Sequence, residues 1–408
     1  MAERRLRLGL VAACAFPAPR GSQILIDEMA VALARLGAEV HLVAPVDPEA
    51  PPRPYHRHPL SRVRRVRPGT RVRGVGLLAR PLFDLALVAR LASVTRRERL
   101  DVLHAHNYEG LFAALLVRRV CGVPVVYHSH NVAADELPLY APKPLRGWAR
   151  RLGDRLDATL PARADRVVVL SRDVGEYLAA RGVERGRISV IPPGLDPGPF
   201  QGLGAVPRER RAVFAGNLDG YQNVELLLDA WRLASEADGG LRLSLVTHER
   251  RAALLGALRE RGLERRVRVV EARDVGDVAR ELRSALVGIS PRISWSGFPI
   301  KTLNYMASGL PTIALAGSAK GVRHGETGWV VADARPEALA EALVASLGRP
   351  EACRERGRAA ARALRAEHAW ERIAPRVLGV ARAALAGRAV AASAAAEKFA
   401  LHRGVETR

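Results

Sequence analysis

Short apolar runs alternate with amphipathic segments along the first half of the chain. Residues 6–13 and 39–44 are apolar runs of strand length, and residues 24–36 between them carry apolar side chains at helical spacing until Gly37. The same rhythm predicts further strands over 102–104, 123–127, 166–170 and 188–191. This order predicts an α/β fold with a doubly wound parallel sheet.

The second half repeats this organisation after a stretch dense in proline and glycine at residues 192–207. Strands are predicted over 211–215, 241–247, 267–270, 287–290, 311–314 and 328–331, with helical patterns between them. We therefore predict two Rossmann-like domains, over residues 1–200 and 205–370. The segment 46–75, rich in proline and arginine, predicts irregular structure that could include an edge strand, and we expect residues 391–408 to form a mobile tail.

Length and composition agree with a globular protein of two domains. The chain has 408 residues, of which 48% are hydrophobic and 26% charged. Its three cysteines are far apart, which excludes a disulfide framework and predicts a reducing, cytoplasmic location. The apolar run near the N-terminus is short and interrupted by Arg7, so we predict a buried strand rather than a signal peptide. No uninterrupted apolar run approaches about 18 residues, so no membrane span is expected.

The formal net charge of +22 comes almost entirely from arginine, since only four of the 64 basic residues are lysine. A coding bias toward arginine and selection for an anionic partner both explain this charge, and both interpretations stay open. Without zinc-finger spacing or an aromatic-rich RNA-binding motif, nucleic acid is not the expected partner. An anionic membrane surface is compatible with the charge.

Two basic segments are candidates for such a membrane contact, one over residues 62–73 and one over 145–156. As a helix, the second segment places four apolar residues on one face, namely Leu145, Trp148, Leu152 and Leu156, and its arginines elsewhere. Basic amphipathic helices with tryptophan can lie on an anionic bilayer. The same pattern also fits a helix whose apolar face packs on the sheet. If the helix lies on the bilayer, the protein is expected at the inner face of the cell membrane.

Polar residues follow the predicted strands of the first half, where open α/β sheets bind ligands. The turn containing Gly21 and Ser22 is either an anion-binding helix start or an ordinary turn with Ser22 as helix cap. The pairs His104 and His106, and His128 and His130, each share one strand face. Since no carboxylate or thiol pattern completes a metal site, we prefer hydrogen bonding to a sugar. The predicted acceptor side of a cleft comprises Ser22, His106, Asn107, His128 and Asn131.

The second half offers two loops that could hold a diphosphate. One follows the strand at 211–215 and contains Gly216, Asn217 and Gln222. The other precedes a helix, where backbone N–H groups and Lys301 would form an anion cradle and Asn304 would reach a ribose hydroxyl. Its predicted donor-binding residues are Ser296, Gly297, Phe298, Pro299 and Ile300. The alternative is a loop and helix that merely pack.

Taken in order, these pieces resemble the retaining glycosyltransferases of the GT-B fold, family 4, over residues 6–375. The matching segments are DVLHAH at 101–106, PVVYHSHN at 124–131, ADRVVVLS at 164–171, ISVIPPGLD at 188–196, GFP at 297–299 and MASGLP at 306–311. The resemblance implies an acceptor domain and a donor domain facing across a cleft. Trp370 resembles the tryptophan before a helix, here 371–390, that crosses back to the first domain.

The resemblance also implies transfer from a nucleotide diphosphate sugar with retention, without a metal ion or other cofactor. It implies that His130 contacts the transferred sugar and that Gly21 lies near the donor phosphates. The acceptor would be a hydroxyl of a glycan, a lipid-linked molecule or a small molecule.

The sequence departs from the family pattern at four charged positions of the donor site. Ser296 and Asn304 stand where the family has glutamates, and Asn217 and Gln222 stand where it has a basic pair. The diphosphate leaving group still requires positive charge. We assign this role first to Lys301 and second to Arg292. The predicted catalytic residues are therefore His130 and Lys301. The alternative function is an inactive sugar-nucleotide-binding or partner-binding protein that keeps the fold.

Overall fold

The first half of the chain is built around a seven-stranded parallel sheet. The computed structural model describes residues 4–60, 80–201, 207–249 and 252–405. The strand order is β3-β2-β1-β4-β5-β6-β7. The direction in which successive strands are added reverses after β3, as in a doubly wound sheet. The strands are β1 (Arg7–Val11), β2 (Glu39–Ala44), β3 (His56–Pro59), β4 (Val102–His106), β5 (Val125–Ser129), β6 (Arg166–Val169) and β7 (Ile188–Val190).

Helices cover both faces of this sheet, which explains why its strands read as continuous apolar runs. They are α1 (Gly21–Arg35), α2 (Arg80–Arg97), α3 (Asn107–Cys121), α4 (Ala133–Tyr140), α5 (Arg146–Thr159) and α6 (Arg172–Ala179). Neighbouring residues of β2 point to opposite cores: Leu42 packs in one cluster with Met29, and Val43 in another with Leu91. Alternation of side chains along a strand produces this division.

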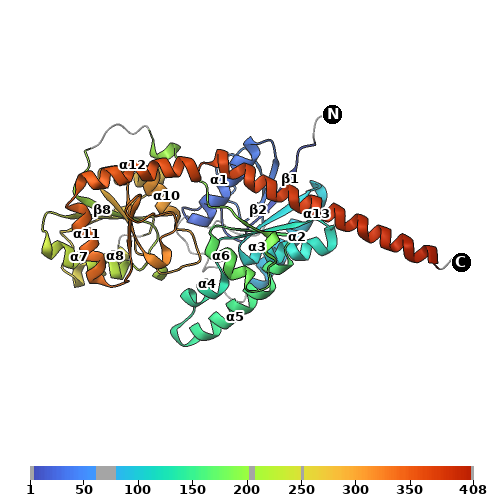
Figure 1. Cartoon of the computed structure of the whole chain (residues 1–408), viewed down its shortest axis with the longest axis horizontal. Coiled ribbons are helices and arrows are strands. Elements are labelled where there is room, and N and C mark those ends of the chain that lie inside the picture. The colour runs from blue at the N-terminus through green and yellow to red at the C-terminus, as the bar shows by residue number, and fades with distance from the viewer. Residues whose placement is uncertain (1–3, 61–79, 202–206, 250–251, 406–408) are drawn as a thin grey trace.

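The second half repeats the architecture with six parallel strands in the order β10-β9-β8-β11-β12-β13. The strands are β8 (Arg211–Ala215), β9 (Arg242–Thr247), β10 (Val267–Glu271), β11 (Val287–Ser290), β12 (Thr312–Leu315) and β13 (Gly328–Val331). The helices are α7 (Val224–Ala237), α8 (Ala252–Glu260), α9 (Val275–Ser284), α10 (Ile300–Ala307), α11 (Pro336–Leu347) and α12 (Pro350–Glu367). The predicted GT-B architecture of two parallel-sheet domains is confirmed (Figure 1).

The last helix, α13 (Trp370–Val405), leaves the second half and packs on the first (Figure 1). Ile373, Val377 and Ala381 of α13 are buried in the core cluster that contains α1. Its start is held by Glu28 of α1, whose carboxylate accepts hydrogen bonds from the Trp370 indole and from the Asp196 backbone, both at 2.8 Å. The helix continues to Val405, where a mobile tail was expected, because alanine-rich sequence favours helix.

Two local predictions require correction. Helix α1 begins at Gly21, with Arg20 as the capping residue, so Ser22 is not the cap. Helix α5 packs on α4 through Ala149, Gly153 and Asp157, and not through its large apolar residues. A Cβ on Gly153 would lie 2.5 Å from the Ala134 backbone, so only small residues allow this close approach.

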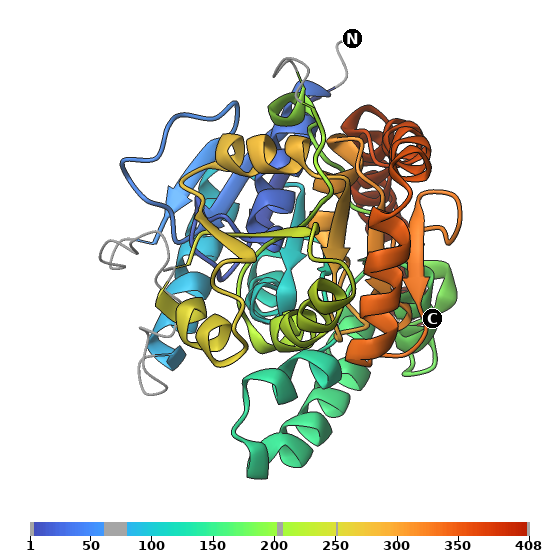
Figure 2. The same ribbon diagram turned by 90° about the vertical axis from the view of Figure 1, so that its left-hand side faces the viewer.

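The face of α5 that carries the large apolar side chains is exposed instead. Trp148 is 65% exposed, and Leu145 and Leu152 are exposed with it. The α4–α5 pair projects from the body of the molecule, as the two perpendicular views show (Figures 1 and 2). No helix of the described segments is long and apolar enough to cross a membrane. The basic segment 62–73 lies outside the described residues.

Candidate active site

A cleft of about 1070 Å³ separates the carboxyl ends of the two sheets. A cavity of this size is at the upper end of the range for small-molecule and cofactor sites. It brings together most of the residues predicted from the sequence, although they come from both halves of the chain. The predicted residues that line it are Gly21, Ser22, Asn107, His130, Asn131, Gly216, Asn217, Gln222, Arg292, Phe298, Pro299, Ile300, Lys301 and Asn304.

His106 and His128, predicted on the acceptor side of the cleft, are buried and are not among the residues that line it. They are buried in a layer of four histidines, in which His104 Nε2 lies 3.2 Å from His128 Nδ1 and His106 Nδ1 lies 3.0 Å from His130 Nε2. These side chains share a sheet face with Val102 and Val126, which pack in the cluster that contains α13. The crossing helix therefore covers this face.

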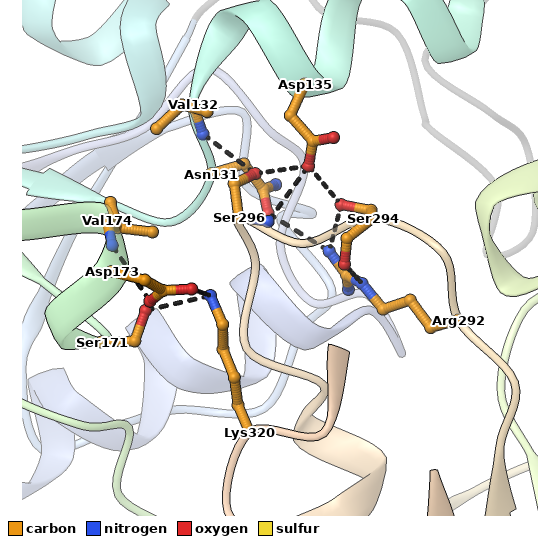
Figure 3. A network of polar contacts seen from close by, with 10 residues as sticks. All are labelled: Asn131, Val132, Asp135, Ser171, Asp173, Val174, Arg292, Ser294, Ser296 and Lys320. Atoms are coloured by element: carbon orange, nitrogen blue, oxygen red, sulfur yellow. Dashed lines mark hydrogen bonds and ion pairs between the residues drawn. The ribbon is translucent and has the colours of Figure 1, made fainter. Parts of the chain in front are cut away.

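Ser296 joins the two domains and does not line the cleft. Its hydroxyl donates to Asp135 of α4 at 2.8 Å and accepts from the Val132 backbone at 3.2 Å. The Ser294 hydroxyl and the Ser296 backbone N–H also donate to Asp135, at 2.7 and 3.1 Å (Figure 3). The hydroxyl of Ser296, which was predicted to bind the donor, is instead hydrogen-bonded between the domains.

Gly297 lies beside this contact and is also absent from the lining of the cleft. A Cβ on Gly297 would be 2.1 Å from Asn131 Oδ1 and 2.2 Å from an Arg292 guanidinium nitrogen. A side chain at this position would therefore displace the Asn131 and Arg292 side chains from their present places. A second link pairs Lys320 with Asp173 and Ser171 of the first domain, each at 3.0 Å (Figure 3).

Two buried cations, Lys301 and Arg292, line the donor side of the cleft. Lys301 Nζ donates to Gln222 Oε1 at 2.6 Å and lies 3.8 Å from the centre of the Phe214 ring. The Arg292 guanidinium donates to Ser294 and lies 4.9 Å from the Tyr221 ring. Burial, and for Lys301 also the neighbouring Arg292 charge, lowers the pKa of both groups. Neither forms an ion pair within the described part of the chain, so the cleft can receive an anion.

The turn before α1 forms the opposite wall. A Cβ on Gly21 would approach Ile300 to 3.1 Å, so this turn lies directly against the donor loop. Arg20 forms an ion pair with Asp219 of the second domain at 3.3 Å. The loop at residues 271–275, which follows β10, completes the lining on the donor side.

Glu136 also lines the cleft, although the sequence did not predict it as a site residue. Asn131 Nδ2 donates to its carboxylate at 3.3 Å, and burial, strengthened by the Glu109 charge, raises its pKa to about 7. A perturbed carboxyl in a cleft is typical of functional sites. No motif around residue 136 indicates this position, because the carboxyl reaches the cleft only through the placement of α4.

Comparison with known proteins identifies the class of this molecule. Residues 20–194 match a family model described as a glycosyl transferase 4-like domain, and residues 209–349 match one described as glycosyl transferases group 1. Two Rossmann-like sheets with a cleft at their carboxyl ends and a helix crossing back form the GT-B fold. The chain belongs to the family 4 type of GT-B glycosyltransferases.

Two curated relatives are named as glycosyltransferases that act on inositol-containing molecules. The chain is 27% identical to a D-inositol 3-phosphate glycosyltransferase of Pseudarthrobacter chlorophenolicus, over 87% of this chain and 88% of that protein. It is also 27% identical to a phosphatidyl-myo-inositol mannosyltransferase of Mycobacterium leprae, over 92% and 96% of the two chains.

Solved structures show the same fold. A sucrose-phosphate synthase of Thermosynechococcus elongatus superposes with a TM-score of 0.79 at 19% identity, over 94% of this chain and all of that one. HepE of Anabaena in complex with UDP and glucose superposes with a TM-score of 0.68 at 16% identity, over 92% and 99% of the two chains. At these identities the likeness concerns the fold alone.

Proposed function

We propose that the protein transfers a sugar from a nucleotide diphosphate sugar to a hydroxyl acceptor, with retention and without a metal ion. The observation that carries this proposal is a pair of buried cations in the cleft, Lys301 in the first turn of α10 and Arg292 in the loop after β11. A helix N-terminus with two cations nearby is suited to a diphosphate. The curated relatives support a glycosyltransferase, and the bound UDP of HepE supports a nucleotide donor.

In this proposal the second domain holds most of the donor, and Gly21 and His130 of the first domain contact it from the opposite side. Lys301 and Arg292 bind the diphosphate, with Gly21 and Gly216 allowing the backbone to approach it. Asn304 hydrogen-bonds the ribose, and the loop at residues 271–275 receives the base. Burial lowers the pKa of His130 to about 4, so it contacts the transferred sugar as a neutral imidazole.

The chemical step exchanges one bond at the anomeric carbon for another. The bond to the diphosphate oxygen breaks, a bond to the acceptor oxygen forms on the same face, and the hydroxyl proton passes to the departing diphosphate. Negative charge therefore grows on the diphosphate, where preorganised cations stabilise the transition state. Glu136 and Asn131, on the first domain, are placed to bind the acceptor hydroxyl.

The inactive alternative rested on Ser296 and Asn304, which replace two glutamates of the family pattern. The contact of Ser296 with Asp135 gives the serine a role between the domains, so its neutrality does not argue against catalysis. The relatives, which are named as transferases, also favour an enzyme.

A panel of UDP-, GDP-, ADP- and dTDP-sugars tests the proposal by thermal shift. At a hundredfold excess over the dissociation constant, the matching donor should stabilise the protein by about 2.7 kcal/mol. Absence of a shift with every donor would contradict the proposal. A shift without donor hydrolysis or transfer would instead support the binding protein.

We also propose that the enzyme acts at an anionic membrane on the cytoplasmic side, through helix α5. Its exposed face combines Trp148 and Leu145, and the exposed arginines Arg146, Arg150 and Arg151 flank it. An amphipathic helix of this kind binds a bilayer through apolar burial and through attraction to anionic lipids. The name of the Mycobacterium leprae relative supports a lipid-borne acceptor.

Replacing Arg146, Arg150 and Arg151 by alanine tests this contact. At about 1 kcal/mol for each basic residue at an anionic surface, binding to phosphatidylglycerol-containing vesicles should weaken by about 100-fold. The matched control replaces three exposed arginines of α12, namely Arg358, Arg362 and Arg365, and removes the same charge. Sedimentation with vesicles measures both variants. Equal binding by the two variants would refute a role for α5.

A further inference from the structure

A second cluster of histidines lies at the edge of the first sheet, away from the cleft. Strands β2 and β3 pair in parallel there, with His41 opposite His56. Because side chains alternate along a strand, Glu39 shares the face of His41, and His58 shares the face of His56. None of these four residues lines the cleft. Glu39 begins β2, whereas the cleft lies at the carboxyl ends of the strands.

The side chains of this cluster converge on one another. His41 Nε2 lies 3.2 Å from Glu39 Oε1, and the His41 and His56 rings stack with their centres 4.7 Å apart. One ligand atom from each of Glu39, His41 and His56 lies within 4.8 Å of the other two. Tetrahedral ligands at about 2.0–2.2 Å from a zinc ion are about 3.3–3.6 Å apart. His56 is exposed, so its ring is free to rotate toward the other two ligands.

We propose that Glu39, His41 and His56 bind a divalent transition-metal ion, with Zn²⁺ as the reference ion. Two imidazoles and one carboxylate are a ligand set that suits zinc and its neighbours, and not Mg²⁺ or Ca²⁺. Three protein ligands leave a fourth position for water. On binding, the ion takes the place of the proton on His41 Nε2, and the neutral ring then carries its proton on Nδ1, which faces His58.

The surroundings hold the ligands as metal sites require. His58 Nε2 lies 3.0 Å from His41 Nδ1, the ring nitrogen that the ion does not use. Such a partner fixes the orientation and tautomer of a metal-binding histidine. Arg7 Nε donates to the other oxygen of Glu39 at 3.0 Å, which leaves Oε1 for the ion. His41 itself is buried, so its position is determined by packing.

The position of the site predicts what the ion does. Strand β3 has four residues and, among the residues that the structure describes, pairs only with β2. A metal bound by residues of both strands would join this edge strand to the sheet. The ion is therefore structural: it should raise stability and leave donor binding in the cleft unchanged.

Zinc binding by the full-length protein without a histidine tag tests the proposal. After dialysis against EDTA, Zn²⁺ should bind with a stoichiometry of one at this site and raise the Tm, whereas equal Mg²⁺ should not. Co²⁺ should give visible absorption bands of a bound ion. His56→Ala removes an exposed ligand, so the variant should fold, lose the bands and bind Zn²⁺ at least tenfold more weakly.

Two further variants separate this site from other histidines. Glu39→Gln should also lose the Co²⁺ bands, whereas His324→Ala, an exposed histidine of the second domain, should keep them. Absence of Zn²⁺ binding by the unaltered protein would overturn the proposal. Equal binding by His56→Ala would assign the ion elsewhere and overturn it too.

Discussion

Replacing Lys301 by methionine is expected to lower kcat/KM for sugar transfer by about 100- to 1000-fold, the range found when one preorganised transition-state contact is lost. Methionine keeps most of the length and apolar contact of the side chain beside Phe214 but removes its charge. Without an anion, burial and Arg292 lower the pKa of Lys301, and a bound diphosphate would raise it again. The lost charge is therefore the one needed as the leaving group departs. Steady-state kinetics with the donor found in the thermal-shift panel measure the effect.

The matched control is Lys143→Met, which removes the same charge from an exposed position outside the cleft. This variant should keep its activity. Binding measurements add a second criterion, since Lys301→Met should weaken the nucleoside diphosphate far more than the nucleoside. Equal loss for both ligands would mean that Lys301 does not contact the diphosphate.

Acidification from pH 7 to pH 5 is expected to destabilise the fold through the four buried histidines. Burial lowers the pKa of His104 to about 3 and of His130 to about 4, and it lowers the pKa of His106 and His128 as well. The folded chain keeps these rings neutral at pH 5, while the unfolded chain binds protons below about 6.5. Stability is therefore lost as pH falls below 6.5, by about 2 kcal/mol at pH 5 for each of His104 and His130, and His106 and His128 act in the same direction.

Two carboxyl groups oppose this trend. Burial raises the pKa of Glu28 and of Glu136 from 4.5 to about 7. Their ionisation costs the folded state roughly 3 kcal/mol each, and this cost disappears as pH falls from 7 toward 4.5. Four histidines outweigh two carboxyls, so the net result is a loss of stability in acid.

Urea unfolding, followed by tryptophan fluorescence at pH 7 and pH 5, measures the balance. His128→Gln, which does not titrate, should reduce the loss between the two pH values. Glu136→Gln should increase it, because one opposing group is removed. The comparison uses the change with pH, so the effect of each substitution on packing does not enter. Stability that is constant or rises on acidification would contradict this account.

The strands could be predicted well from the sequence. The bounds of β8, β11 and β13 agree with the prediction to the residue. Strands that are buried on both faces have nearly unbroken apolar sequences, which makes them easy to locate. The sequence also predicted that Lys301 and Gly216 lie at the cleft, since both follow strands at the edge where such sheets bind ligands. The sequence did not predict where α1 begins or which face of α5 packs on α4. Hydrophobicity does not distinguish the small residues that allow two helices or a turn to approach closely.

The site was predicted less completely. Asp135 and Glu136 were missed, since the partners of Asp135 on the donor loop, Ser294 and Ser296, lie about 160 residues further along the chain. His106 and His128 were placed in the cleft because they follow the pattern of strand-end polar residues. The packing of α13, which covers their face of the sheet, has no signature near either histidine.

By itself the sequence determined the two parallel sheets, their division near residue 200 and the loop that carries Lys301. These features follow from local order: apolar periodicity, the turns marked by glycine and proline, and the short separation between a strand and the loop after it. Only the tertiary structure decided which polar side chains face the cleft and which join the domains. Ser296 contacts Asp135, Lys301 faces the cleft and His128 is buried. None of these outcomes follows from local sequence, because each depends on how the two sheets and the crossing helix pack together.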